Sequence, residues 1–326
     1  MSEEAFERTS LYRRAFIEAR TDCTVEEQRF FQENFREMRA RVIPLVEKIQ
    51  RDMPDYTVHD ITHLDALWEM GSLLLTKEGD ITPAEAFVFG GAVLLHDAGM
   101  TIAAYPGGLP EIERTIEWQD TIACLAQEQP KLTKAEITRQ AIPTALRQLH
   151  AKAAESLALN SWKDEHGKEQ YLIERSELRS FYGRSIGLIA YSHWWPVHKV
   201  GEHFSNALGA YPKDCTTTVD RLKVACLLRL SDALHIDRRR APPFQRTLLR
   251  PEGPSADHWT AQEKIAKPRL EGDEIVFSSG DAFPRSESSA WWLLFEMIAG
   301  IDKELRDVDA LLRETAKHRF LSLIHI

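Results

Sequence analysis

Cysteine and long apolar runs are both scarce in this sequence, and each scarcity excludes a class of protein. The four cysteines, Cys23, Cys124, Cys215 and Cys226, are widely spaced and form no CxxC pair. This spacing argues against a disulfide framework or a zinc ribbon, and it is typical of the reduced, mostly buried thiols of a cytoplasmic protein. No stretch approaches about 18 apolar residues, so no membrane span is expected.

Excess positive charge and an apolar N-terminal segment are also missing. The sequence has 41 Lys and Arg against 50 Asp and Glu, which gives a net charge of −9. This balance argues against a generally basic nucleic-acid-binding or membrane-surface protein, although it leaves room for a local basic pocket. The first ten residues, MSEEAFERTS, are acidic and lack the apolar core of a signal peptide. We therefore expect a cytoplasmic protein that binds neither DNA nor a membrane.

Helix signals dominate the chain, whose 326 residues suggest about two domains or one large one. Capping boxes are predicted where a threonine is followed three residues later by a glutamate, at Thr24 and Glu27, Thr82 and Glu85, and Thr133 and Glu136. The first box begins a long helix that runs to about residue 52. The second precedes AFVFGGAVLLHD, which is apolar nearly all round and is expected to form the buried centre of a mainly α domain. Further helices are expected from about residues 176 and 218.

The pattern changes after the basic run at residues 238–240. FQRTLLR, WTAQEKIAK and EIVFSS resemble short strands separated by the turn sequences PEGP and LEGD. We expect an α-helical domain over residues 1–240, a small β appendage over 241–285, and a C-terminal helix over 286–326 that packs on the first domain. The last residues, FLSLIHI, have no helix stop signal and are expected to expose apolar side chains, as in a chain cut before a further domain.

A set of histidines and aspartates lies near the apolar helical runs. Its members are His59, His63, His96, Asp97, His150, His193 and Asp232. His59 and His63 are four residues apart, so on a helix they would share one face. Any single histidine has the alternative interpretation of a core ring bonded to a backbone carbonyl. The two aspartates lie within apolar runs, where an unpaired carboxylate costs several kcal/mol. For Asp232 the structural alternative is an ion pair with Arg229.

The order H…HD…D resembles the signature of the HD-domain superfamily, which consists largely of metal-dependent phosphohydrolases on an all-α scaffold. The matching residues are His63, His96, Asp97 and Asp232, and the resemblance covers about residues 50–240. The resemblance extends to an HxxxH segment before the doublet His96-Asp97 and to LRLSDALH after this doublet. LLHDAGM is similar to the LLHDIGK of the HD-GYP phosphodiesterases, but Met100 stands where that group has lysine. Cyclic-dinucleotide hydrolysis is therefore not expected.

The resemblance implies a role for each residue of the set. HDITH resembles the HxxxH of cyclic-nucleotide phosphodiesterases, which implies that His59 is the general acid and His63 a metal ligand. His96, Asp97 and Asp232 would complete the first metal site. His150 and His193 stand where two-metal HD proteins hold a second ion, and Asp97 would then bridge the two ions and be essential for catalysis.

The chemistry of these residues agrees with that implication. Imidazole and carboxylate ligands suit one or two divalent ions of Mn, Fe, Co, Ni or Zn. Arg147, one helical turn before His150, is placed to bind a phosphate or else to lie on the surface. Together with the resemblance, these residues predict an enzyme, a metal-dependent phosphohydrolase or phosphodiesterase that acts on a nucleotide-like phosphoester.

Other motifs in the sequence permit other interpretations. HDITH approximates the HExxH of zinc proteases, but this leaves the HD doublet and Asp232 unexplained. GRSIG, residues 183–187, matches a nucleophile elbow but lies in a helical pattern. The run RRR at 238–240 is typical of a solvated turn, and a contact with polyphosphate or nucleic acid is the less common alternative. Two alternatives stay open: a di-iron HD oxygenase, which shares the ligand order, and a regulatory or effector HD module of a larger bacterial protein with a C-terminal gyrase- or histidine-kinase-type ATPase. The expected partner is a phosphorylated small molecule or nucleotide.

Overall fold

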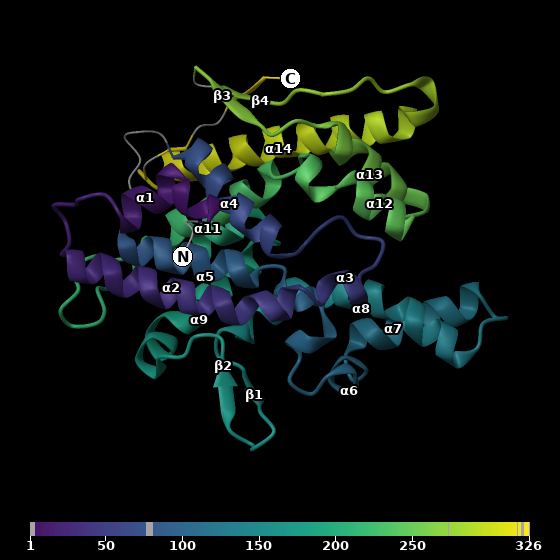
Figure 1. Ribbon diagram of the computed structural model, residues 1–326, viewed down its shortest axis with the longest axis horizontal. Helices are drawn as coiled ribbons and strands as arrows, with labels where there is room; N and C mark the ends of the chain where they lie inside the picture. The colour runs from purple at the N-terminus through teal and green to yellow at the C-terminus, as the bar shows by residue number, and fades with distance from the viewer. Residues whose placement is uncertain (1–3, 76–80, 273, 318, 321–322, 326) are drawn as a thin grey trace.

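The computed structural model describes residues 4–75, 81–272, 274–317, 319–320 and 323–325, and this part of the chain is mainly α-helical (Figure 1). The α-helices are α1 Ser10–Phe16, α2 Val25–Val46, α3 Ile49–Asp52, α4 Ile61–Leu74, α5 Pro83–Leu95, α6 Leu109–Ile112, α7 Ile116–Glu128, α8 Lys134–Leu157, α9 Ser176–Ser192, α10 Val197–His203, α11 Arg221–Leu234, α12 Pro243–Leu249, α13 Gly253–Lys264 and α14 Ser288–Glu314. The 3₁₀ helices are η1 Ala5–Arg8, η2 Ala98–Met100, η3 Ile102–Ala104, η4 Arg238–Arg240 and η5 Arg285–Glu287.

The strands are few and short. They are β1 Ser161–Lys163, β2 Glu169–Tyr171, β3 Arg269–Glu271, β4 Glu274–Val276 and β5 Leu323–His325. β1 and β2 form an antiparallel hairpin, and β4 pairs with β3 antiparallel and with β5 parallel. The predicted fold class, mainly α with a small β appendage, is confirmed.

α5 is the centre of the helical core, and all of its residues from Pro83 to Leu95 are buried. Its start follows the predicted capping box. The Thr82 hydroxyl accepts a hydrogen bond from Glu85 N–H, and the Glu85 carboxylate accepts one from Thr82 N–H. Proline occupies the first turn, as also predicted. α2, α4, α9 and α11 all pack against it. Because the helix is apolar on every side, each buried Leu or Phe adds about 1.5–3 kcal/mol wherever it points. The burial of α5 therefore fixes the position of His96 and Asp97, which directly follow this helix.

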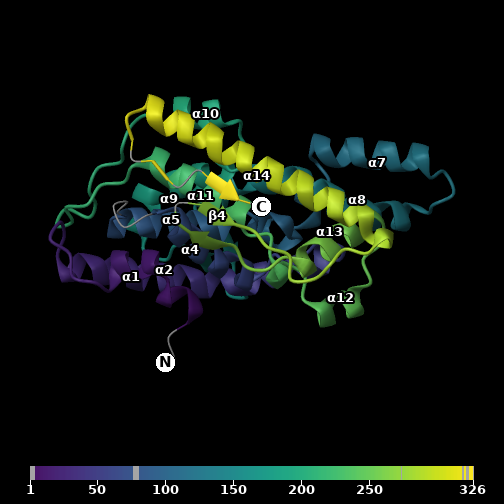
Figure 2. The same ribbon diagram turned by 90° about the horizontal axis from the view of Figure 1, so that it is seen from above.

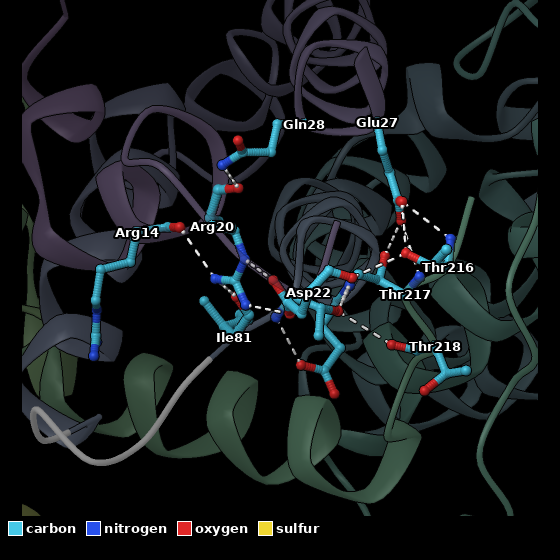
Figure 3. A network of polar contacts seen from close by, with 12 residues as sticks. Arg14, Arg20, Asp22, Glu27, Gln28, Ile81, Thr216, Thr217 and Thr218 are labelled. Atoms are coloured by element: carbon cyan, nitrogen blue, oxygen red, sulfur yellow. Dashed lines mark hydrogen bonds and ion pairs between the residues drawn. The ribbon is translucent and has the colours of Figure 1, made fainter. Parts of the chain in front are cut away.

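Polar contacts join the N-terminal helices to the loop that precedes α11 (Figure 3). Thr24 caps α2 as predicted, but the Glu27 carboxylate does not complete the capping box. It accepts hydrogen bonds from the backbone N–H groups of Thr216 and Thr217, each at 3.0 Å. Arg20 donates to the carbonyl of Ile81 at 2.9 Å. A long-range partner thus replaces the local one, and it fixes the entrance to α11.

The segment after residue 240 differs from the prediction. FQRTLLR and WTAQEKIAK are the helices α12 and α13, and only EIVFSS contains a strand, β4. Pro243 and Pro254 lie in the first turns of these helices, where a missing N–H costs nothing. Trp259 of α13 is fully buried in a cluster with Val58 and Ala241. Tertiary burial of this side chain therefore stabilises a helix that the local pattern does not indicate.

α14 runs along one face of the helical core, over α10, α11 and α13 (Figure 2). Its observed start at Ser288 is close to the predicted one. In the terminal segment FLSLIHI, Phe320 is buried, while the side chains of the residues that follow lie outside the described part of the chain. Among the described residues, no helix has the length and apolar character that crossing a membrane requires.

Candidate metal centre

Four side chains from three core elements converge on one point. They are His63 of α4, His96 and Asp97 at the end of α5, and Asp232 of α11. His96 Nε2 lies 3.2 Å from Asp97 Oδ2 and 3.5 Å from Asp232 Oδ1. His63 Nε2 lies 3.7 and 3.4 Å from the same two oxygens. We call these four residues the first group.

A second group shares Asp97 with the first. It consists of Asp97, His150 of α8 and His193, which directly follows α9. His150 Nε2 lies 3.5 Å from Asp97 Oδ1, whereas the contacts with the first group use Oδ2. The carboxylate therefore lies between the two groups and directs one oxygen to each. This is the arrangement that a bridging ligand requires.

A glycine permits the HD turn, which is the segment from His96 through η2, to approach α8 closely. A Cβ at Gly99 would lie 2.5 Å from the carbonyl oxygen and 2.8 Å from the Cα of His150. Any larger side chain in this position would push η2 away from α8. Gly99 in HDAGM therefore sets the distance between the two groups.

Backbone carbonyls fix the orientation of three rings. Nδ1 of His96, His150 and His193 donates to the carbonyl three residues earlier, at 2.8, 2.7 and 2.6 Å respectively. A neutral imidazole that donates through Nδ1 carries its lone pair on Nε2. His150 and His193, which burial keeps neutral, thus present this lone pair on the side that faces Asp97, whereas His96 presents it only after it loses its Nε2 proton. Hydrogen bonds of this kind orient the histidines that bind metal ions in proteins.

Burial keeps most of these rings neutral. It lowers the pKa of His63 and His193, and it lowers that of His150 to about 3. His96 differs, because burial alone would lower its pKa but Asp97 and Asp232 raise it well above the usual value. The same contacts act in reverse on the two carboxyls. Burial would raise their pKa values, but His96 outweighs it and lowers both.

The donor set fits a divalent ion. Atoms that share an ion at about 2.0–2.2 Å lie about 3.0–4.2 Å from one another, which is the spacing in the first group. In each group all donor atoms lie within 4.8 Å of one another. This buried His/Asp cluster could therefore hold a divalent metal. The ligand roles predicted for its six members stay predictions.

Two arginines face the same centre. Arg240 Nη2 donates to His59 Nε2 at 2.7 Å, and Nη1 lies 2.6 Å from His63 Nδ1 and 3.0 Å from its Nε2. Arg147 Nη1 lies 3.4 Å from His150 Nε2, and its guanidinium covers the Trp194 ring at 4.9 Å. Within the described residues, neither arginine has a carboxylate at ion-pair distance. An ion at His63 would compete with Arg240 for Nε2.

Sequence reasoning missed Arg240. The run RRR was expected to be a solvated turn, but it forms η4, and Arg240 is 8% exposed while Arg238 is exposed. Arg239 pairs with Asp237 and Glu69. Three identical residues in a row give no sign of which one turns inward, so no signal in the sequence could have selected Arg240.

His59 is not on the helix that carries His63. α4 begins at Ile61 with Asp60 as its N-cap, so the expected shared helical face does not exist. The rings nevertheless lie 5.8 Å apart, and His59 Nε2 is 3.9 Å from Asp97 Oδ2. His59 Nδ1 donates to the Thr57 carbonyl. Burial and then Arg240 lower the pKa of His59 to about 3.

Arg229 does not form the ion pair with Asp232 that was weighed as an alternative. It pairs with Glu304 of α14 and donates to the carbonyls of Ser192 and Trp195, each at 2.9 Å. These carbonyls flank His193 and Trp194. Arg229 therefore holds the end of α9, and Asp232 is left to face the histidines.

A cavity of about 400 Å³ opens onto this centre, and residues of both groups line it. Its lining includes His59, Asp97, Arg147, His193, Asp232 and Arg240. Trp194, a further residue that the sequence did not single out, stands beside Arg147 and is 48% exposed. The cavity thus combines acidic and imidazole donors with three arginines, Arg147, Arg229 and Arg240, of which Arg229 pairs with Glu304.

The comparisons with known proteins agree with this architecture at the level of family. The model of the HD-CE family matches residues 53–307, which include both groups, Arg240, α13 and most of α14. Neither the search of curated proteins nor the search of solved structures gave a match.

Proposed function

The chain belongs to the HD-CE family, and we propose that it is a metal-dependent phosphohydrolase or phosphodiesterase that acts on a nucleotide-like phosphoester. The HD-type domain and its buried His/Asp cluster support a hydrolase of this general kind. The phosphoester substrate is the finer part of the proposal and rests on the cavity.

The observation that carries the proposal is the pair Arg147 and Arg240. Both line the cavity together with Asp97 and Asp232, and among the described residues neither has a carboxylate at ion-pair distance. Arg240 is buried and Arg147 half-buried, and an anionic ligand would gain by forming the direct ion pairs that these guanidinium groups lack among the described residues. A guanidinium matches the oxygens of a phosphoryl group through paired N–H donors.

Each side chain has a defined task in this proposal. His63, His96, Asp97 and Asp232 would hold one divalent ion, and Asp97, His150 and His193 a second. Bound there, such an ion supplies positive charge to the phosphoryl oxygens and lowers the pKa of a water molecule. Arg147 and Arg240 bind and orient the phosphoryl group against this centre.

His59 is proposed to donate the proton to the leaving oxygen. For this its Nε2 must be protonated, yet that atom accepts a hydrogen bond from Arg240. A phosphoryl group that draws Arg240 away removes the neighbouring cation and adds an anion. Both changes raise the pKa of His59. Proton donation by His59 is therefore coupled to substrate binding through Arg240.

The test combines metal analysis with hydrolysis. Protein purified without chelator is analysed for Mn, Fe, Co, Ni and Zn, and bis(p-nitrophenyl) phosphate and nucleoside phosphoesters are screened as substrates. We expect Arg240→Gln to lower kcat/KM by about 10- to 100-fold, the size of a lost hydrogen bond to a charged group. Arg238→Gln, from the same run but exposed, is the matched control and should leave kcat/KM unchanged.

Other outcomes would assign the centre differently. Oxygen consumption without phosphate release would favour the di-iron oxygenase, whose ligand order is the same. Binding of a phosphorylated ligand without turnover would favour a regulatory HD module of a larger protein. Equal effects of the Arg240 and Arg238 variants would contradict the phosphate-binding role.

A further inference from the structure

The cavity has a second lobe on the side of α13. This lobe, of about 470 Å³, shares His59, Arg147, Asp232 and Arg240 with the part beside the metal centre. Its own lining includes Tyr56, Thr57, Ser255, His258 and Gln262. A ligand held by the two arginines would therefore have space for a further substituent on this side.

Fixed structure surrounds the second lobe. Trp259 is fully buried and donates through Nε1 to the carbonyl of Asp55 at 3.0 Å, which joins α13 to the loop before His59. In that loop, Val58 N–H donates to the carbonyl of Arg240 at 2.8 Å. The loop before His59, α13 and η4 thus form one packed unit. A ligand in the lobe would meet a surface that is already organised.

Gln262 is the unusual residue of this surface. It is 5% exposed, and no described residue donates a hydrogen bond to its buried Oε1. A buried carbonyl oxygen without a donor costs about 1–3 kcal/mol, and native proteins rarely leave one so. Because Gln262 lines the lobe, a turn of its side-chain amide would bring this oxygen to a donor on a ligand there.

We propose that the second lobe binds an organic substituent of the phosphoester and that Gln262 accepts a hydrogen bond from an N–H or O–H group of that substituent. This inference rests on the proposed function for the position of the phosphoryl group, between Arg147 and Arg240. Gln262, which lines the second lobe and not the part beside the metal centre, is then a specificity-determining residue. The donor chemistry is shared by the ring N–H or amino group of a nucleobase and by the hydroxyls of a sugar.

Calorimetric titrations of the full chain test the proposal without any need for turnover. The ligands are inorganic phosphate, a series of nucleoside monophosphates and a series of hexose phosphates. We expect at least one organic series to bind about 10-fold or more tightly than inorganic phosphate, and which series does so identifies the source of the donor. Gln262→Met, which keeps the shape but removes the acceptor, should weaken that ligand about 3- to 10-fold and leave the affinity for inorganic phosphate unchanged.

The matched control is Gln245→Met on α12, a position outside both lobes whose amide contacts Gln50. This variant should bind every ligand as wild type does. The proposal fails if organic phosphates bind no more tightly than inorganic phosphate, or if Gln262→Met weakens both equally. Tight binding with the expected Gln262 effect but without hydrolysis would uphold the lobe and overturn the hydrolase. Hydrolysis without a Gln262 effect would do the reverse.

Discussion

The two groups around Asp97 are built by different parts of the fold. The first group takes His63, His96 and Asp232 from three helices that pack together in the core. The second depends on the end of α9, which Arg229 holds, and on the close approach of Gly99 to α8. The first also offers four donor residues and the second only three. If both groups bind an ion, the first offers the more complete set of ligands, and the second would leave more positions for water and substrate oxygens.

Asp97→Ala should have the largest effect, because it removes the one residue that both groups share. We expect metal binding and activity to be abolished together, as measured by elemental analysis and by hydrolysis of bis(p-nitrophenyl) phosphate. Asp97→Asn is the shape-matched comparison, and thermal unfolding verifies that each variant is folded. A folded Asp97→Ala protein that keeps its full metal content would contradict the shared-ligand role.

Substitutions in one group at a time should show whether the two groups bind metal separately. We expect Asp232→Asn to lower the affinity of the first group and His150→Ala that of the second. In a two-metal protein, His150→Ala should therefore leave about one ion per chain, bound as tightly as in wild type. Titration with Mn²⁺ after chelator treatment measures both affinities. If His150→Ala releases all metal, the two groups do not act as separate sites.

His59→Ala should leave the metal content near that of wild type, because this residue belongs to neither group. Turnover should fall by about 10²–10⁴-fold, the usual contribution of a general acid. A substrate with a good leaving group, such as a nitrophenyl ester, should recover much of this loss. Loss of metal, or equal losses on good and poor leaving groups, would show that His59 is a ligand or a structural residue.

Gly99→Ala should disturb the spacing of the groups without removing any donor. Its Cβ would collide with the backbone of His150, so we expect a loss of about 1–3 kcal/mol in the free energy of unfolding. Metal bound by the second group should weaken more than metal bound by the first. Gly209→Ala, where no atom lies within 4 Å of the added Cβ, is the control. Equal weakening of both sites would mean that Gly99 matters only for general stability.

The smallest effect is expected at Asp52, which holds the chain just after the HD turn. Its Oδ2 accepts hydrogen bonds from the Thr101 hydroxyl at 2.6 Å and from Ile102 N–H at 2.9 Å. Burial would raise the pKa of Asp52, but hydrogen bonds from Arg51, Thr101 and Ile102 outweigh it and lower the pKa. A lowered folded-state pKa means that this carboxylate stabilises the protein above about pH 4 and loses that effect as the pH falls further.

Asp52→Asn should therefore cost about 1 kcal/mol at pH 7, and the difference from wild type should shrink as the pH falls below about 4. Urea denaturation at a series of pH values measures it. Asp120→Asn, at an exposed position of α7, is the control and should leave the free energy of unfolding at pH 7 unchanged. A difference that is constant with pH would assign the effect of Asp52 to packing.

The sequence allowed the core to be predicted where the signals are local. The cap at Thr82 and the apolar run after it define α5, because both act within one turn of the residues concerned. The convergence of the first group was expected only from the resemblance to HD domains, since His63, His96 and Asp232 are far apart in the chain. Tertiary contacts decided the rest. The burial of Trp259 fixes α13 as a helix, and no local pattern distinguishes Arg240 from Arg238 or gives Gln262 its place in the cavity.

The salt bridge between Arg229 and Glu304 connects α14 to the second group. The same guanidinium holds the two carbonyls that flank His193 and Trp194, so a displacement of α14 would be transmitted to the His193 ring. Thermodynamic coupling is reciprocal, so a ligand that orders His193 must also strengthen the docking of α14, a helix of 27 residues. A ligand bound at His193 would thereby affect how α14 packs on the core.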